Sequence, residues 1–516
     1  MDDELNIAKL VIEDHDDHAR EDLDNLAWDK NDEAWEVSQA RLLKISTSKT
    51  AASIAAAKFD NEVTFSPPVL LGGFNILFKI EVEGMASDVF MRLPCPDVSQ
   101  FPSEKTLYEG ATARYVKQYT KIPTPKVFYY GDESELGPFM ILERIPDCGL
   151  MSFRICAHIE NTDIPVVLDP DISESSLERF YTKAALCLLR LSRLSFNRIG
   201  SLSEGEDNTF SITGRPLCKN MNNMLQLANI PRSVLPLESK TYSTADEWYV
   251  ALAEMHIAQL IFQHNDLVRS EDDCRNKYVA RQIFRRLAKD RQLSIFGFSN
   301  DKWSAQSETW TSKLSPAPSN VDSFTLWADD FRPGNMLIDD SDELAAVIDW
   351  EFTYAAPTQF ALDSPWWLLL EVPEMWKTGI DDWCKVYGMR LRTFLSAMEK
   401  AEKEENAGSE KVTFLLSTHM RESWETGRFW LDYAAKDSWA FDTVFWKYLD
   451  QRFFGKRKDG VTKDNLWKSR VDLLSEKERE AMETFVQWKM EDKKERILVD
   501  WDPEEAKKRF AELLFD

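Results

Sequence analysis

Carboxylates lie at the ends of two short apolar runs in the stretch 326–352, LWADDFRPGNMLIDDSDELAAVIDWEF. Asp330 precedes Asn335 by five positions, and Asp349 ends the second run. An Asp placed in this way can accept the proton of an attacking hydroxyl group, while an Asn and a second Asp offer the hard oxygen ligands that Mg²⁺ prefers. The pattern predicts a phosphotransferase site. The alternative interpretation is structural, with two acidic β-turns and a helix cap.

The two apolar runs, MLID and LAAVID, are predicted to form a hairpin within an otherwise helical region. A hairpin would bring Asn335 and Asp349 together, because each flanks one strand of the pair. Carboxylates are costly in such a place unless a cation compensates them, and a bound metal ion would do so. Asp339, Asp340 and Asp342 are predicted to be turn residues.

A glycine turn opens the first β-rich part of the chain. Gly72 and Gly73 precede the run FNILFKIEVEG, and a second β-rich run, SDVFMRLP, follows Glu83-Gly84, so the two runs are predicted to pair. The segment GGFN, which ends at Asn75, can bring backbone N–H groups close to phosphates. An ordinary tight turn is the alternative.

A buried cation is predicted beside this turn. Arg92 lies in the strand SDVFMRLP, where an apolar environment requires a partner for its charge. Glu109, in the following helix, is placed in sequence to be that partner, and the two are similar to the cation–glutamate pair that orients ATP phosphates in kinases. The alternative is a surface Arg and a solvated Glu.

The pattern of elements predicts an α+β chain of two lobes, because 516 residues exceed the size of one ordinary hydrophobic core. Residues 1–60 form an acidic helical extension, 61–147 a small mixed β/α lobe that binds nucleotide, and 148–516 a helical lobe. The helical lobe contains the catalytic loop 326–352 and Trp-rich C-terminal helices, whose aromatic residues are predicted to be core packing rather than a cage for a quaternary amine.

Composition argues against several classes of function. The net charge of −25 and pI near 4.8 disfavour nucleic-acid binding and are compatible with a cationic small substrate. Seven scattered Cys without C-x-x-C spacing predict a reducing compartment with neither a zinc site nor a disulfide framework. No apolar run reaches the length of about 18 residues that a membrane span needs, and the acidic N-terminus is unlike a signal peptide. A cytoplasmic protein without membrane contact is expected.

One helix carries many basic residues. The segment CRNKYVARQIFRRLAK, which starts at Cys274, is predicted to be helical, and its Arg and Lys side chains are predicted to form a solvated basic face. A ligand-binding patch is the alternative.

The order of the motifs identifies a family. Six features follow one another in the order found in kinase sequences: a glycine turn, a strand cation, a helix Glu, PFMILERIP, D-x-x-x-x-N and a terminal Asp. The chain resembles the aminoglycoside phosphotransferase (APH) family of small-molecule kinases, in particular its fungal branch. The resemblance covers about residues 60–500 and rests on GGFN, MRLP, YEGATARYVKQYTKIPTPKVF, FMILERI, DDFRPGNMLID and VIDWEFTYAAP, with PWWLLLEVPEMW and FWKYLDQRFFG typical of the fungal branch.

This resemblance implies a bilobal protein-kinase-like fold with ATP in the cleft between a small β-rich lobe and a large helical lobe. It implies Asp330 as the catalytic base, with Asn335 and Asp349 as Mg²⁺ ligands. The segment from Glu143 to Ile145 would be the hinge whose backbone meets the adenine.

Arg332, within DDFRPGN, adds a cation near the expected γ-phosphate. Its alternative role is a salt bridge to Asp329 or Asp330. The chain departs from the family at two further places. Ala328 stands where the family usually has a loop-supporting His, and Arg92 stands where kinases commonly use Lys. Both departures predict weakened catalysis, unless a neighbour such as Trp327 or Asp329 supports the loop instead.

The leading hypothesis is an ATP- and Mg²⁺-dependent phosphotransferase that acts on a hydroxyl group of a small-molecule metabolite. The motif D-W-E leads directly into FTYAAP without the activation loop of protein kinases, which favours a small acceptor, including a cationic one. Two alternatives remain open: a nucleotide-binding pseudokinase or scaffold with little or no turnover, and a kinase-fold enzyme that uses ATP to activate a carboxylate.

Overall fold

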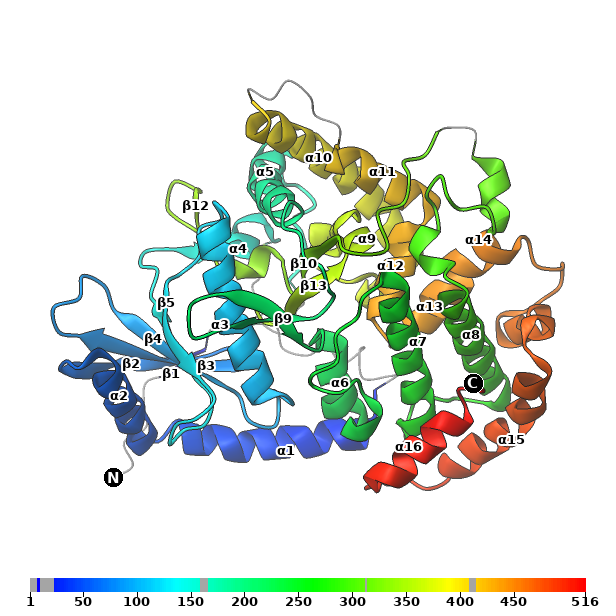
Figure 1. The fold of residues 1–516 in the computed structure, drawn as a ribbon, viewed down its shortest axis with the longest axis horizontal. Coiled ribbons are helices and arrows are strands. Elements are labelled where there is room, and N and C mark those ends of the chain that lie inside the picture. The colour runs from blue at the N-terminus through cyan, green and yellow to red at the C-terminus, as the bar shows by residue number, and fades with distance from the viewer. Residues whose placement is uncertain (1–6, 10–22, 158–165, 311–312, 408–413) are drawn as a thin grey trace.

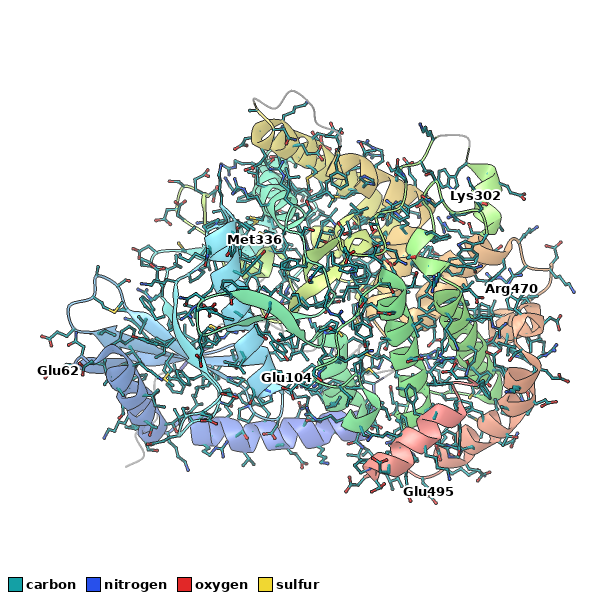
Figure 2. All side chains as sticks on the ribbon, viewed as in Figure 1. Glu62, Glu104, Lys302, Met336, Arg470 and Glu495 are labelled. Carbon is teal, nitrogen blue, oxygen red and sulfur yellow. The ribbon has the colours of Figure 1, made fainter. Side chains whose placement is uncertain are left out.

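In the computed structural model of the chain, the described residues are 7–9, 23–157, 166–310, 313–407 and 414–516. They form a β-rich lobe beside a larger helical lobe, so the predicted bilobal α+β fold is confirmed (Figure 1). Side chains fill both lobes. Met336 is fully buried, whereas Glu62, Lys302 and Glu495 are exposed at the periphery (Figure 2).

The β-rich lobe contains a six-stranded sheet with the strand order β1-β2-β3-β4-β6-β5. Its strands are β1 (Ile7–Lys9), β2 (Val63–Leu71), β3 (Asn75–Val82), β4 (Val89–Pro94), β5 (Val127–Gly131) and β6 (Phe139–Glu143). Neighbouring strands are antiparallel except β1 and β2, which are parallel. The predicted pairing of the runs on either side of Glu83-Gly84 is confirmed, since β3 and β4 form a hairpin.

Two helices belong to this lobe. Helix α2 (Ile45–Phe59) packs on β2 and β3 through Ala51 and Ala55, whose small, fully buried side chains let the helix approach the sheet closely. Helix α3 (Pro102–Tyr119) contacts both β5 of the sheet and β13 (Thr353–Pro357) of the helical lobe. Helix α3 therefore lies between the two lobes.

The helical lobe contains the remaining helices and several short strands. Its helices are α4 (Met151–Ile155), α5 (Glu174–Leu191), α6 (Lys219–Ala228), α7 (Ala245–Phe262), α8 (Glu271–Lys289), α9 (Thr358–Ala361), α10 (Ile380–Glu405), α11 (Leu416–Thr426), α12 (Arg428–Lys436), α13 (Phe441–Val444), α14 (Asp450–Phe454), α15 (Glu476–Asp492) and α16 (Pro503–Glu512). Among the helices of the described residues, none combines the length and the apolar character needed to cross a lipid bilayer.

Several short strands complete the helical lobe, and some of them lie on either side of the loop that carries Asp330. They are β7 (Gly149–Leu150), β8 (Ser201–Glu204), β9 (Phe210–Gly214), β10 (Phe324–Ala328), β11 (Met336–Ile338) and β12 (Leu344–Val347). Strands β11 and β12 are antiparallel, which confirms the predicted hairpin, and β7 pairs with β11 as a third strand. Strand β10, which leads into the loop, pairs with β13, which leaves it.

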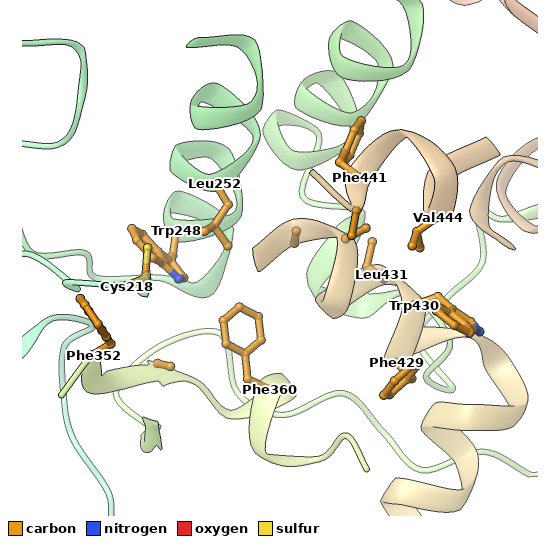
Figure 3. Packing of buried hydrophobic residues seen from close by; sticks show 14 of the residues in the cluster. Cys218, Trp248, Leu252, Phe352, Phe360, Phe429, Trp430, Leu431, Phe441 and Val444 are labelled. Atoms are coloured by element: carbon orange, nitrogen blue, oxygen red, sulfur yellow. The ribbon is translucent and has the colours of Figure 1, made fainter. Parts of the chain in front are cut away.

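Aromatic residues form much of the core of the helical lobe, as predicted for the Trp-rich region. Trp383 is fully buried, and its ring stacks on that of Tyr387 with centroids 4.3 Å apart. Phe429 and Trp430 of α12 pack in the same core, which continues through Phe441 of α13 (Figure 3).

The basic residues of α8 form the predicted solvated face only in part. Arg275 and Arg286 are partly exposed and Lys289 is exposed, but Lys277, Arg281 and Arg285 are buried, and for these three the prediction is wrong. Arg281 is fully buried and pairs with Asp442. Arg285 is also buried and pairs with Glu254 at 2.9 Å. Their carboxylate partners come from elements distant in sequence, so the sequence of α8 alone could not show that these charges are buried and compensated.

Helix α1 (Asn25–Leu42) joins the two lobes and is fixed at its start by Asp24. The Asp24 carboxylate accepts hydrogen bonds from the N–H groups of Leu26 and Ala27, both at 3.1 Å. It also accepts hydrogen bonds from the backbone N–H and the side-chain amide of Asn265, at 3.2 and 2.9 Å. This one carboxylate caps α1 and ties it to the helical lobe.

We expect Asp24→Ala to lower the free energy of unfolding by about 2–4 kcal/mol, because it removes a helix cap and leaves the buried donors of Asn265 without an acceptor. Urea denaturation measures the loss. Glu33→Ala removes an exposed carboxylate from the same helix and is the matched control. Equal losses in the two variants would contradict the anchoring role of Asp24.

Candidate active site

A cavity of about 1740 Å³ lies between the lobes. Pockets for one small molecule usually measure about 300–1,000 Å³, so this cavity has room for two ligands side by side. Every site residue predicted from the sequence lines it: Gly72, Gly73, Asn75, Arg92, Glu109, Glu143, Ile145, Asp330, Arg332, Asn335 and Asp349.

Asp330 stands at the end of strand β10 with its carboxylate held from three sides. Nδ2 of Asn335 donates to Oδ2 and to the backbone carbonyl of Asp330, both at 2.8 Å. Oδ1 lies 3.2 Å from Nε of Arg332 and 3.6 Å from Nζ of Lys219, the first residue of α6. Burial opposes ionisation of Asp330, but these two cations outweigh it and hold its pKa below the usual value. Asp330 is therefore an ionised carboxylate, suited to accept a proton.

Two of these contacts bear on the sequence predictions. Arg332 forms the salt bridge to Asp330 that was its alternative role, and it also lines the cavity. Lys219 was missed, because it comes from a helix more than a hundred residues before the loop and nothing in its local sequence marks it.

Arg92 and Glu109 form the predicted ion pair at the boundary between the lobes. Both side chains are buried, and the guanidinium of Arg92 also lies 3.2 Å from Oδ1 of Asp349. Arg92 thus joins α3 of the β-rich lobe to the end of the β11–β12 hairpin.

A second ion pair, between Lys105 and Glu351, was not predicted. Both side chains are 1% exposed. Nζ of Lys105 donates to Oδ1 of Asn75 at 2.7 Å, and Nδ2 of Asn75 donates to Glu351 at 3.0 Å. Asn75 therefore acts through its side chain, not only through the glycine turn. One sequence signal was available: Lys105 precedes Glu109 by four residues and so lies on the same face of α3.

These contacts bring three carboxylates together against two cations. Oxygen atoms of Glu109, Asp349 and Glu351 lie within 4.8 Å of one another. Burial, together with the charge of Glu351, raises the pKa of Asp349 to about 8. The cluster therefore lacks one positive charge, and a bound cation at Asp349 would supply it.

Asn335 and Asp349 fit a magnesium ion. The N–H of Ile348 donates to the carbonyl of Asn335 at 2.9 Å, so the two residues flank the same end of the hairpin. The side-chain hydrogen bonds of Asn335 use Nδ2 rather than Oδ1, and the ion pair of Asp349 with Arg92 uses Oδ1 rather than Oδ2. One amide oxygen and one carboxylate oxygen are thus available as hard ligands.

The glycine turn is closed by a hydrogen bond from the N–H of Gly72 to the carbonyl of Asn75 at 2.8 Å. That N–H is used within the turn rather than offered to a phosphate. A Cβ atom added at Gly73 would meet nothing within 4 Å, so the backbone there faces open space along the cavity. Gly73 is the part of the turn that a phosphate can approach.

The expected hinge follows strand β6. The N–H and a carboxylate oxygen of Glu143 bond to the backbone of Lys126, at 2.8 and 3.0 Å, and this fixes the end of β6 beside β5. Phe90 of β4 pairs in register with Leu142, and both line the cavity together with Ile145. These side chains give the cavity an apolar wall beside the expected hinge, as is common in small-molecule pockets.

The loop that carries Asp330 is held in place without a His at position 328. Nε1 of Trp327 donates to Oδ1 of Asp329 at 2.7 Å, and the N–H of Lys219 donates to Oδ2 at 3.0 Å. Nζ of Lys436 lies 3.8 Å from the ring centroid of Trp327. Ala328 adds no polar group, and the loop is held against α6 by the residues on either side of it.

One protein family matches the chain in comparisons with known proteins. The model of the phosphotransferase enzyme family, APH, matches residues 81–401. No curated protein matches the chain.

Solved structures give matches of low identity. A macrolide 2'-phosphotransferase type I is 13% identical, with 84% of this chain and 98% of that chain covered and a TM-score of 0.36. A thermostable mutant of aminoglycoside phosphotransferase APH(4)-Ia, in a ternary complex with AMP-PNP and hygromycin B, is 13% identical, with 86% and 98% covered and a TM-score of 0.32. The GDP and kanamycin complex of APH(2")-IIia is 12% identical, with 78% and 97% covered and a TM-score of 0.35.

Proposed function

The chain belongs to the phosphotransferase enzyme family, APH, and from this premise we propose that it is an ATP- and Mg²⁺-dependent kinase that phosphorylates a hydroxyl group of a small, positively charged metabolite. In this proposal residues 61–147 bind the nucleotide, 148–516 bind the acceptor, and 1–60 are an extension outside the family match. The proposal rests on one observation: Asp330, Asn335 and Asp349 line the same cavity, which has room for two ligands.

Asp330 is the proposed base. Its ionised carboxylate accepts the proton of the acceptor hydroxyl as the oxygen forms its bond to the γ-phosphorus of ATP, and the bond from that phosphorus to the β-phosphate oxygen breaks. The two hydrogen bonds from Asn335 fix Oδ2 and the backbone of Asp330, so the carboxylate keeps one orientation while it receives the proton. Positioning of this kind supplies most of the catalysis in phosphoryl transfer.

The nucleotide would lie across the boundary between the lobes, with its base between the apolar residues beside Glu143 and Ile145. Gly73 leaves room for the phosphates, and Arg92 presents a buried positive charge oriented by Glu109. Asn335 and Asp349 would hold Mg²⁺, whose chemistry when bound is to neutralise the charge of the phosphates.

Arg332 and Lys219 flank the proposed base. In addition to keeping Asp330 ionised, their charges stabilise the negative charge that develops on the transferred phosphoryl group. We infer that the contact of Trp327 with Asp329 replaces a loop-supporting His and keeps the base in place.

Another part of the cavity wall supports a cationic acceptor. It is lined by the carboxylates of Glu371, Glu374 and Asp437 and by the aromatic ring of Tyr433. The hydroxyl of Tyr433 donates to both oxygens of Glu374, at 3.0 and 2.8 Å, so that carboxylate is fixed in the wall. Carboxylates interleaved with aromatic rings stabilise an ammonium group by charge and by cation–π contact.

The test is phosphoryl transfer from Mg-ATP to an extract of small cationic metabolites, with the product identified by mass spectrometry and omission of Mg²⁺ as the control. Transfer that requires Mg²⁺ is expected. A rise in melting temperature with Mg-ATP and no transfer to any compound would instead indicate a nucleotide-binding protein. Absence of both effects would contradict nucleotide binding altogether.

We expect Trp327→Phe to lower the rate of transfer by up to about 100-fold, because loss of the indole N–H releases Asp329 and shifts the loop that carries Asp330. The rise in melting temperature with Mg-ATP should be unchanged. Trp303→Phe is the matched control, since it removes an indole hydrogen bond to Gln292 that is remote from the cavity. Equal rates in the wild type and Trp327→Phe would contradict the supporting role.

A further inference from the structure

Helix α1 reaches the cavity although it lies before the segment that matches the family, which starts at residue 81. It runs along one side of the molecule, from α2 in the β-rich lobe to α6 in the helical lobe (Figure 1). Trp28 of α1 and the preceding Leu23 line the cavity. The extension therefore contributes to the wall of the candidate active site.

These two residues form an apolar cluster with residues of the helical lobe. Leu23, Trp28 and Leu227 of α6 pack as one buried cluster, and Trp439 packs against it. All four side chains line the cavity. This part of the cavity therefore presents an aromatic and aliphatic surface. The carboxylate of Asp437 lies beside it, since it accepts a hydrogen bond from the N–H of Trp439 at 2.9 Å.

The wall is fixed in position at both ends of α1. At its start, Asp24 binds Asn265, and the N–H of Asp24 donates to the carbonyl of Leu227 at 3.1 Å. Near its end, the hydroxyl of Ser38 donates to Asp97 of the β-rich lobe at 2.7 Å. Trp28 is thus held at a set place relative to both lobes.

Helix α6 connects this apolar wall with Asp330. Its residues Lys219, Asn220, Asn223, Gln226 and Leu227 line the cavity, and their spacing places them on one face of the helix. Lys219 lies beside Asp330, and Leu227 packs with Trp28. Eight residues of helix separate the two, a length of about 12 Å.

We propose that the acceptor is an elongated amino alcohol that lies along this face of α6, with its hydroxyl group at Asp330 and an apolar end against Trp28. The inference rests on the proposed function for the position of the hydroxyl group. It adds the length of the acceptor, the apolar character of its far end and a specificity-determining residue outside the family match. The amide side chain of Asn223 provides a polar contact along the way, whereas the amide of Asn220 is engaged with Ser438.

The test is calorimetric binding to the protein loaded with Mg-AMP-PNP. Two probes share one head group: ethanolamine, which is short, and phenylbutyl-ethanolamine, which carries an apolar ring at the far end of a flexible chain. The longer probe is expected to bind at least about tenfold more tightly, from ring contact with Trp28. Equal affinities for the two probes would overturn the proposal.

Variants locate the contact. Trp28→Leu should remove most of the tenfold advantage and leave ethanolamine binding unchanged, while Trp35→Leu, on the same helix but outside the cavity wall, should change neither. Asn223→Trp changes α6 rather than α1, obstructs the path along α6 and should weaken only the longer probe. Unchanged binding of the longer probe to both Trp28→Leu and Asn223→Trp would overturn the proposal.

Binding of AMP-PNP to each variant verifies that the variant is folded. These experiments measure binding rather than phosphoryl transfer. A result that contradicts the acceptor path therefore differs from one that contradicts the proposed reaction. If the longer probe binds as expected and is not phosphorylated, the proposed reaction is contradicted and the acceptor path stands. If compounds are phosphorylated and Trp28→Leu affects both probes alike, the path is contradicted and the reaction stands.

Discussion

Asp330→Asn is expected to lower the rate of phosphoryl transfer by about 10²–10⁴-fold, the usual contribution of a placed general base. The amide has the shape of the carboxylate but cannot take the proton. Binding of Mg-ATP should persist, because the proposed metal ligands, Asn335 and Asp349, are unchanged. The rate is measured as ADP release in the presence of acceptor, and nucleotide binding as the rise in melting temperature.

Asp340→Asn is the matched control, since it makes the same change in an exposed turn of the β11–β12 hairpin. It should keep the wild-type rate. If Asp330→Asn transferred phosphate as fast as the wild type, Asp330 would not be the base and the proposed mechanism would be wrong. If both variants were slow, the hairpin rather than the carboxylate would explain the effect.

Lys105→Met is expected to lower the free energy of unfolding by about 3–5 kcal/mol, because it leaves the buried Glu351 with only the more distant Arg92, at 3.8 Å, as a cationic partner. Three carboxylates would then share one cation, Arg92. Global stability of a protein is typically about 5–15 kcal/mol, so the loss is a large share of the total. Urea denaturation measures it, through the midpoint at constant slope.

Lys117→Met, on the same helix, removes an exposed Lys and should cost far less. The double variant Lys105→Met with Glu351→Gln should recover part of the loss, since the unpaired charge is removed with its partner. A double variant no more stable than Lys105→Met alone would show that the two residues do not compensate each other.

Much of the candidate site could be predicted because its parts are local. Asn335 and Asp349 flank a tight hairpin, so their proximity follows from the turn between them. Arg92 and Glu109 follow each other as strand and helix of one small lobe, and burial of the strand requires a partner for Arg92. Hydrophobic periodicity and the spacing of residues within a short segment are enough to predict contacts of this kind.

Other site residues could not be predicted because they meet only when the lobes fold together. Lys105 and Glu351 are far apart in the chain, and the sequence around each one predicts an ordinary solvated charge. Lys219 comes from the first turn of α6, and its position beside Asp330 depends on the contact of Asp329 with the backbone of that helix. The arginines of α8 show the same effect in the core, where distant carboxylates allow them to be buried.

The sequence by itself determined the α+β class, the order of the phosphotransferase residues and the hairpin that joins Asn335 to Asp349. These depend on hydrophobic periodicity and short-range turns, which act within a few residues. Only the tertiary structure decided the charge balance of the candidate site, the support of the loop that carries Asp330 by Trp327 and Asp329, and the place of Trp28 in the cavity wall. Each of these depends on contacts between segments far apart in the chain, and burial turns such contacts into strong electrostatic and packing constraints.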